Sequence, residues 1–441
     1  MGPELIAIIA LVALFVIGTL LPINMGALAY VAAWLVGMYA LDLDEKEILA
    51  GVSGDLILTL IGVTYLFAIA KNNGTVDLIV TTAVKAVGGR VALIPWVMFA
   101  VTALLTSIGA ASPAACAIIG PIALGFAGKY KISPLMMGMF VVHGAQGGGF
   151  SPISIYGTIT NSVMRENGLP VSEMTVFLAS LVVNLVMAAI LFLALGGRRL
   201  MSQRIEPGDD DTLTADLHTG GAKVTARGYG VDAPTGTAAT GVRTDQVLTL
   251  VAFVGVAVVA LAFDKNIGFV AITAAVILAM LSAQEHKGAV SQIAWPTVLL
   301  VAGVSTYAAI LTQAGSPEYV GGWAAGLGAV AIGALILCYV GGVVSAFASS
   351  TALLPVIVPI AIPLIVDGGI HPAMFIAALA ISSTIVDVSP FSTNGALMLA
   401  NRPDTVTEQV YYKQILTYSV IVVLVGPLLV WAALVLPGWG A

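Results

Sequence analysis

Small hydroxyl residues, glycines and prolines interrupt long apolar stretches at four places in this chain of 441 residues, namely 109–113, 147–152, 348–351 and 387–394. Where a helix is broken, one half begins with exposed N–H groups and the other half ends with exposed carbonyl groups. These groups attract anions and cations respectively, and neighbouring hydroxyls can contact both. One such break is a tolerated kink, whereas four of them favour an ion-binding site in an apolar environment.

Few charged side chains accompany the breaks, and each is a candidate for function because charge is costly inside a membrane span. Asp387 lies in the last break. Its functional role would be to ligate a cation or carry a proton, and its structural role would be to cap the adjacent half-helix. For His143 with Gln146 we favour hydrogen bonds across helices over substrate contact, and for Asp55 an N-terminal helix cap over a ligand. No Lys or Arg lies in the middle of a predicted span. A carboxylate would therefore be held by hydroxyls, amides, backbone N–H groups and a bound cation, which would couple anion to cation.

The elements that position these breaks are predicted to be membrane helices. Hydrophobic residues make up 59% of the chain and charged residues only 9%, against about 25% charged residues in soluble domains. A helix of about 20 apolar residues is long enough to cross a bilayer. Hydropathy predicts five spans in each half, at 4–22, 24–41, 54–71, 134–165 and 173–196, then at 247–263, 267–283, 295–313, 372–400 and 412–436. The fold class is therefore an all-α membrane protein.

Two further apolar segments, 91–128 and 325–367, are too long for one span and are broken in their middle. We predict that each is a re-entrant hairpin, which enters and leaves the membrane on the same side. With the N-terminus outside, this topology leaves on the outer side only Lys46, Arg165 and Lys265 of the 17 basic residues. Because cytoplasmic loops are rich in Lys and Arg, we expect this orientation in the inner, or plasma, membrane.

The two halves of the chain are predicted to be an internal repeat. A shift of 238 residues superposes the hairpin regions without a gap, and the superposed pairs include Ser107 with Ser345, Ser112 with Ser350, Pro121 with Pro359, Ser151 with Ser389 and Gly157 with Gly395. A weaker match at a shift of 241 pairs Gly62 with Gly303 and Gly74 with Gly315. We predict a first repeat at 1–196, a flexible cytoplasmic linker at 197–245 and a second repeat at 246–441. Because each repeat crosses an odd number of times, the second is inverted relative to the first, as in many secondary transporters.

This pattern resembles the ion transporter superfamily, and within it the divalent anion:sodium symporters, over nearly the whole chain. Members carry a Ser-Asn-Thr signature at each hairpin tip, before an apolar run that ends in Pro-Ile. Ser-Ser-Thr at 349–351 is close to this signature, whereas Ala-Ser-Pro at 111–113 departs further from it. Gly-Thr-x-x-Asn at 157–161 and Ser-Thr-Asn at 392–394 are similar to the family's motifs at the two breaks. The segments 62–70 and 143–149 look most like the malonate-carrier branch.

The resemblance implies a short dicarboxylate as substrate and Na⁺ as the coupling ion, with no other cofactor and no nucleic-acid partner. It also implies a homodimer, in which a transport domain of hairpins and broken helices moves like an elevator against a fixed scaffold. The candidate substrate ligands are Ser112, Pro113, Ser154, Thr158, Asn161, Ser350, Thr351, Thr393 and Asn394. The candidate cation ligands are Ser107, Ser112, Gly149, Ser151, Ser345, Ser350, Asp387, Ser389 and Ser392.

We therefore predict a sodium-coupled symporter of malonate or a C4-dicarboxylate. The alternative within the same superfamily is a sodium/proton antiporter that uses Asp387. An intramembrane enzyme is not favoured, because the sequence has no His-Glu-x-x-His, Gly-x-Ser-x-Gly or paired intramembrane Asp motif. A channel is also weaker, since two hairpins that meet at mid-membrane suit occlusion better than a continuous pore.

Overall fold

The computed structural model describes residues 2–85, 87–204, 243–263, 265–282, 286–325, 330–346, 349–366 and 368–438. Its regular structure in these ranges is helical, without a strand, so the predicted all-α class is confirmed. Most of the predicted linker at 197–245 lies outside the described residues, as does Ala348 in the second hairpin tip.

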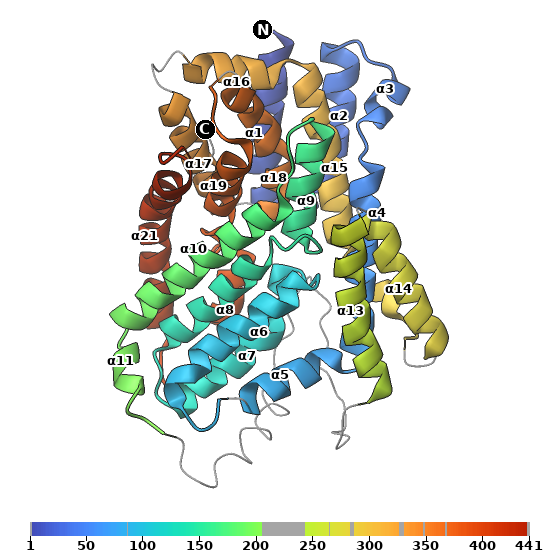
Figure 1. Ribbon diagram of the computed structural model, residues 1–441. Coiled ribbons are helices and arrows are strands. Elements are labelled where there is room, and N and C mark those ends of the chain that lie inside the picture. Colours follow the sequence, from blue (N-terminus) through green and yellow to red (C-terminus); the bar gives the residue numbers. More distant parts are fainter. Residues whose placement is uncertain are drawn as a thin grey trace.

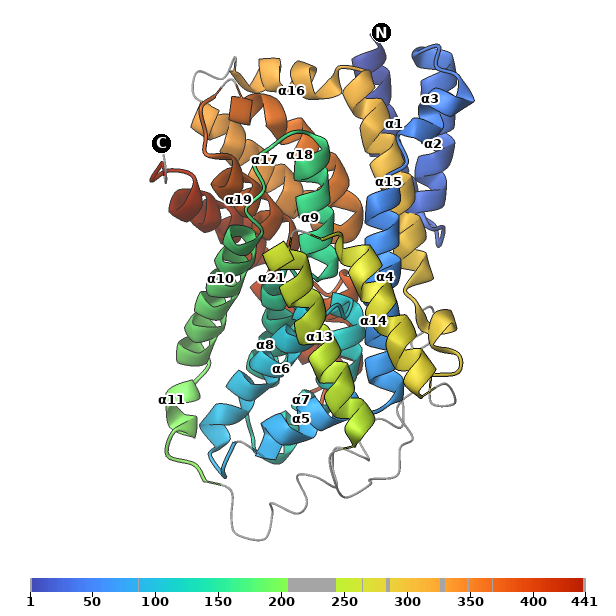
Figure 2. The same cartoon turned by 45° about the vertical axis from the view of Figure 1, so that its right-hand side comes forward.

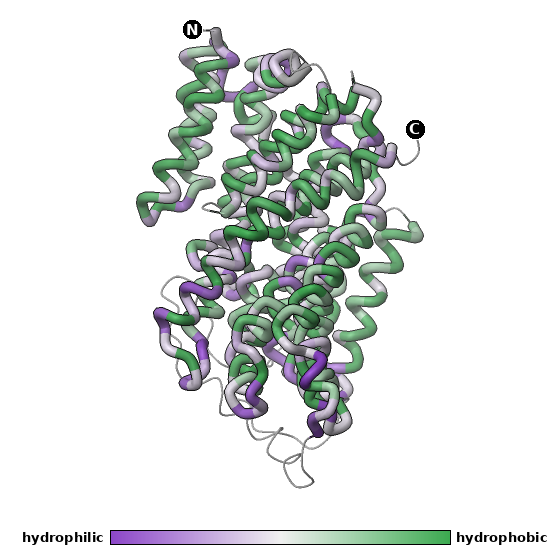
Figure 3. The backbone as a smooth tube through the Cα atoms, turned by 90° about the vertical axis from the view of Figure 1, so that its left-hand side faces the viewer, coloured by the Kyte–Doolittle hydropathy of each residue, from purple (hydrophilic) through white to green (hydrophobic). Residues whose placement is uncertain are grey.

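Apolar helices occupy the predicted uninterrupted spans. They are α1 (Pro3–Leu20), α2 (Met25–Ala40), α4 (Gly54–Asn72), α10 (Glu173–Ala194), α13 (Thr244–Phe263), α14 (Ile267–Leu281), α15 (Trp295–Gln313) and α21 (Glu408–Leu434). Among the described residues, seven helices are long and apolar enough to cross a membrane. Large hydrophobic side chains such as Val12, Val182 and Val254 are exposed on them, and Figure 3 shows the apolar residues running along the helices. Such surfaces suit lipid rather than water, so the chain is a multi-pass membrane protein.

The remaining apolar segments form helices that stop at the predicted breaks. The hairpins are α6 (Ile94–Ser107) with α7 (Ser112–Lys129), and α17 (Val330–Ser345) with α18 (Ser350–Val366). The broken helices are α8 (Pro134–Gly148) with α9 (Ile155–Glu166), and α19 (Pro372–Thr384) with α20 (Thr393–Ala400). Because α7 alone has 18 residues and the composition of a membrane span, the re-entrant course of the hairpins stays a prediction.

Several short helices were not predicted from the sequence: α3 (Glu45–Ala50), α5 (Thr75–Lys85), α11 (Gly197–Leu200), α16 (Ser316–Ala325), and the 3₁₀ turns η1 (Val91–Leu93) and η2 (Ala289–Gln292). Two of them, α5 and α16, begin 241 residues apart, and each follows a glycine with a φ of 75° or 74°. Figure 1 shows α5 across the bottom of the molecule and α16 across the top. Opposite placement of matching elements is what an inverted repeat produces.

Close helix pairs on one side of the molecule carry matching glycines. A Cβ on Gly303 of α15 would lie 2.0 Å from the carbonyl oxygen of Gly26 in α2, and a Cβ on Gly62 of α4 would lie 2.6 Å from that of Gly268 in α14. Small residues let membrane helices approach closely. In Figure 2 these four helices stand together with α1, while α6, α8, α10, α17, α19 and α21 lie on the other side.

Candidate functional site

In each broken helix, a serine caps the start of the second half-helix. In the first break, Ser154 Oγ accepts a hydrogen bond from Gly157 N at 3.3 Å and lies 2.6 Å from Ser151 O, and it also donates to Gly149 O. In the second, 238 residues later, Ser392 Oγ accepts from Gly395 N at 3.2 Å and lies 2.8 Å from Ser389 O and 2.6 Å from Asp387 O. The cap directs the second half-helix back over the end of the first.

A second serine in each break ties it to the hairpin that precedes it. Ser151 Oγ donates to Ser107 O at 2.7 Å, and Ser389 Oγ donates to Ala346 O at 3.1 Å. The hydroxyl of Ser107 bonds Ala103 O of its own helix at 2.7 Å, whereas that of Ser345 lies 2.8 Å from Ser350 Oγ. Hairpin and break in each half are therefore held as one unit.

Both hairpin tips and both breaks open onto one cavity of about 600 Å³. The predicted ligands that line it are Ser112, Pro113, Gly149, Ser350, Thr351, Asp387, Ser392, Thr393 and Asn394. The predicted ligands outside the lining are Ser107, Ser151, Ser154, Thr158, Asn161, Ser345 and Ser389. Ser151, Ser154 and Ser389 are occupied by the backbone contacts above, while Thr158 and Asn161 are buried without a side-chain partner among the described residues.

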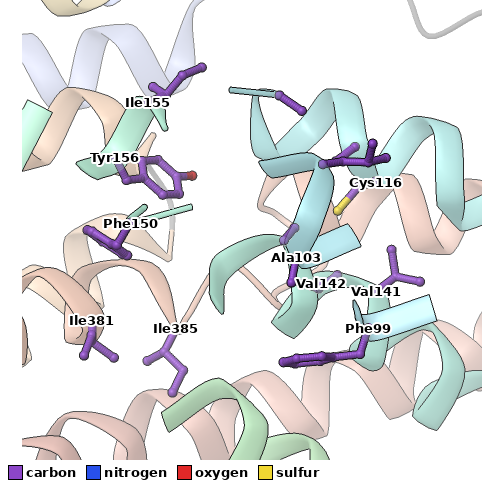
Figure 4. Close-up of a cluster of buried hydrophobic side chains, with 14 of the residues drawn as sticks. Phe99, Ala103, Cys116, Val141, Val142, Phe150, Ile155, Tyr156, Ile381 and Ile385 are labelled. Carbon is purple, nitrogen blue, oxygen red and sulfur yellow. The ribbon is translucent and has the colours of Figure 1, made fainter. Parts of the chain in front are cut away.

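The two halves also touch each other across this cavity. Asn394 Nδ2 donates to Ser112 Oγ at 2.9 Å, and Tyr156 Oη donates to Asp387 Oδ2 at 3.5 Å. Ser350 Oγ donates to the same carboxylate oxygen at 2.9 Å. Figure 4 shows Tyr156 beside Phe150, and their ring centroids are 5.4 Å apart. Sequence reasoning missed Tyr156, although the 238-residue shift pairs it with the predicted ligand Asn394.

Comparison with known protein families covers both halves of the chain. Residues 1–149 match the model of the N-terminus of the dicarboxylate carrier protein MatC, and residues 258–439 match that of the citrate transporter family. Each matched part of the chain is therefore similar to a family of organic-anion carriers, and the chain is a transporter. The matched families are carriers, so the expectation that it is not an enzyme is confirmed.

A solved structure supports the fold of this transporter. The crystal structure of the YdaH transporter from Alcanivorax borkumensis, described as having an unusual topology, superposes with a TM-score of 0.57. The alignment has 13% sequence identity and covers 90% of this chain and 87% of that one. A comparison with curated proteins finds no match.

In the transporter, Asp387 faces Ser350, at the start of α18 in the second hairpin tip. Its side chain is 7% exposed, and its carboxylate accepts the bonds from Ser350 and Tyr156. The cap of α20 is Ser392, so the alternative in which Asp387 caps the adjacent half-helix is wrong. Among the described residues that line the cavity, Asp387 is the only acidic one.

His143, which lies outside the cavity lining, has a structural role. His143 contacts Asn184 Oδ1 at 2.8 Å through Nδ1 and Tyr418 Oη at 2.6 Å through Nε2, which confirms the predicted hydrogen bonds across helices for His143. These contacts join α8 to α10 and α21. The side-chain amide of Gln146 has no partner among the described residues, so the same prediction is wrong for Gln146.

The predicted cap role of Asp55 is wrong. The N-cap of α4 is Ser53, whose Oγ accepts from Leu56 N at 3.3 Å. Asp55 lies two positions further on, where its carboxylate bonds Asn266, lies 3.4 Å from Ser162 Oγ and lies 3.8 Å from Arg165 Nη1. Asp55 therefore joins α4 to the end of α9 and to the start of α14.

Proposed function

We propose that the transporter carries a small dicarboxylate across the plasma membrane, coupled to Na⁺. The observation that carries this proposal is the convergence of four helix starts on one cavity: α7 at Ser112, α9 at Ile155, α18 at Ser350 and α20 at Thr393. Each helix start offers the positive end of the helix dipole and the N–H groups of its first turn, of which the serine caps of α9 and α20 take one each. Carboxylate groups bind well to such ends.

The cavity volume and the family matches support a small organic anion as the substrate. About 600 Å³ lies within the range of about 300–1,000 Å³ usual for small-molecule sites. The first matched family is described as a dicarboxylate carrier and the second as a citrate transporter. Hydroxyl and amide groups of Ser112, Thr351, Thr393 and Asn394 lie among the helix starts and would orient the carboxylates.

Coupling to a cation is supported by oxygen atoms that follow the first half-helices, α8 and α19. The carbonyls of Gly149 and Asp387 lie at matching positions of the two breaks, and the Asp387 carboxylate adds a negative charge to the second. Oxygen ligands of this kind suit Na⁺, and a buried carboxylate is stable as an anion only when a cation or donors compensate it. Serines 345, 350 and 392 would complete the second site.

Movement and assembly are further parts of the proposal. The glycine-packed helices α2, α4, α14 and α15 would form the fixed scaffold of a homodimer, and the hairpins with the broken helices would slide against it as an elevator. The N-terminus would lie outside and the segment at 197–245 in the cytoplasm, as the distribution of basic residues favours.

The direct test is uptake by purified protein in proteoliposomes. An inward Na⁺ gradient should drive accumulation of labelled malonate or succinate above equilibrium, and an inward K⁺ gradient of the same size should not. Lack of uptake of every dicarboxylate and tricarboxylate tested would overturn the proposal. Na⁺-driven proton efflux in the absence of any carboxylate, followed with an internal pH dye, would instead favour the sodium/proton antiporter that uses Asp387.

A further inference from the structure

The cavity wall formed by α4 contains one basic side chain. Of the described residues that line the cavity, Lys71 is the only one with a positive charge. It lies in the last turn of α4, and Thr64, Phe67 and Ala68 of the same helix also line the wall. Spacings of three, four and seven residues place these side chains on one helix face. The face of α4 that ends in Lys71 is therefore turned towards the cavity.

The surroundings of Lys71 form a polar end of the cavity. Ser291 and Gln292, from η2, line the same cavity, and Gln292 Nε2 donates to Asn72 Oδ1 at 2.9 Å. This bond places η2 against the end of α4. The four helix starts that face the cavity belong to the hairpins and broken helices, whereas Lys71 and η2 belong to helices on the other side of the molecule (Figure 2).

We propose that Lys71 is a carboxylate-binding residue of the transport cavity, and that it selects for substrates with two negative charges. This inference rests on the proposed function, because it takes the substrate to be a dicarboxylate. One carboxylate would be held at the helix starts of the tips and breaks, and Lys71 supplies a full positive charge for a second anionic group at the α4 wall. An ammonium group on a flexible stem suits this task, since it can follow a ligand that moves.

A purely structural role for Lys71 is also physically reasonable. A lysine in the last turn of a helix interacts favourably with the negative end of the helix dipole. The two roles predict different results, because a dipole contact contributes to stability, whereas a substrate contact contributes to affinity. The exposed Lys85 offers the matched control: it is basic, also lies in the last turn of its helix, α5, and does not line the cavity.

The test uses proteoliposomes that contain the full-length protein. It measures the half-saturation concentration, which is the concentration of malonate or succinate that gives half of the maximal uptake rate. Lys71→Gln should raise it about tenfold, the effect of one lost hydrogen bond between charged groups. Lys71→Arg should stay within about threefold of the wild type because it keeps the charge, and Lys85→Gln should leave the value unchanged. Half-saturation for Lys71→Gln that equals the wild-type value, or an equal rise in the two Gln variants, would overturn the assignment.

A second measurement uses the unmodified transporter, so it does not depend on the variants folding. Lysines are labelled with an amine-reactive reagent in the presence and absence of malonate, and the labelling rates are read by mass spectrometry. Malonate should slow the labelling of Lys71 severalfold and leave that of Lys85 unchanged. Equal rates at Lys71 with and without malonate would contradict the proposal. If the wild type takes up no dicarboxylate, the proposed function itself fails; if it does and Lys71 has no effect, only this inference fails.

Discussion

The two breaks share one backbone design and differ in the chemistry that they present. Both have a capping serine, a serine tied to the preceding hairpin, and a glycine three residues after the cap. Yet the position occupied by Gly149 in the first break is Asp387 in the second. The repeated frame therefore sets the helix starts that favour an anion, while one substitution gives the second break a charge that favours a cation.

A second pair of positions has the same role in both halves but uses different side chains. Tyr156 and Asn394 are 238 residues apart, and each reaches across to the other half of the molecule. Tyr156 contacts the carboxylate of Asp387, whereas Asn394 contacts the hydroxyl of Ser112. The asymmetry between the breaks thus includes their partners: the carboxylate belongs to the second break, and Tyr156 of the first half donates a hydrogen bond to it.

The largest expected effect tests the backbone arrangement that the two breaks share. A Cβ on Gly157 would lie 2.0 Å from Ser151 O, and a Cβ on Gly395 would lie 1.9 Å from Ser389 O. Because a backbone oxygen cannot move aside as a side chain does, Gly157→Ala and Gly395→Ala should each cost about 3 kcal/mol or more of stability. Thermal unfolding in detergent should show a similar large fall in both variants.

The control for these variants is Gly255→Ala in α13, where an added Cβ meets no atom within 4 Å. It should fold like the wild type, because alanine favours a helix over glycine. If alanine is tolerated at one of the two break glycines and not at the other, the breaks do not share a backbone frame.

The next prediction tests the difference between the breaks. Asp387→Asn removes the negative charge and keeps the shape of the side chain. Loss of one member of a buried charge pair costs about 3 kcal/mol, so Na⁺-driven malonate uptake should fall about 100-fold. The exposed Asp404→Asn, outside the cavity lining, should transport like the wild type. Unchanged Na⁺ dependence in Asp387→Asn would show that the carboxylate is not what distinguishes the second break.

The sequence was most informative where apolar runs and their breaks determine the helices. Ser112 and Pro113 begin α7, and Ser389 and Pro390 lie between α19 and α20, so the predicted breaks agree with the observed ones. The short helices α5 and α16 were missed because neither is long or apolar enough to be predicted as a span. The sequence analysis assigned the cap of α4 to Asp55 instead of Ser53, because the two residues lie two positions apart and both residue types are common at helix starts.

The ligand set was harder to predict than the helices. Hydroxyl residues in a break can face the cavity or bond the backbone, and the sequence does not distinguish the two. Ser112 and Ser350 line the cavity, whereas Ser151 and Ser389 fasten the hairpins. Tyr156 was overlooked because an aromatic residue beside apolar ones suggests only packing, and its contact with Asp387 joins segments far apart in the chain.

The smallest expected effect compares two matching serines, Ser154 and Ser392. It distinguishes their contribution to stability from a contribution to ion or substrate binding. Ser154→Ala and Ser392→Ala each remove an N-cap and should each lower stability by about 1 kcal/mol. Only Ser392 lines the cavity, so only Ser392→Ala should also raise the half-saturation for Na⁺ or malonate, by a few fold. Ser133→Ala, which removes the cap of α8 away from the cavity, should reproduce the loss of stability alone. Equal changes in half-saturation for Ser154→Ala and Ser392→Ala would mean that the caps act only through the backbone, and that the second break owes its difference to Asp387 alone.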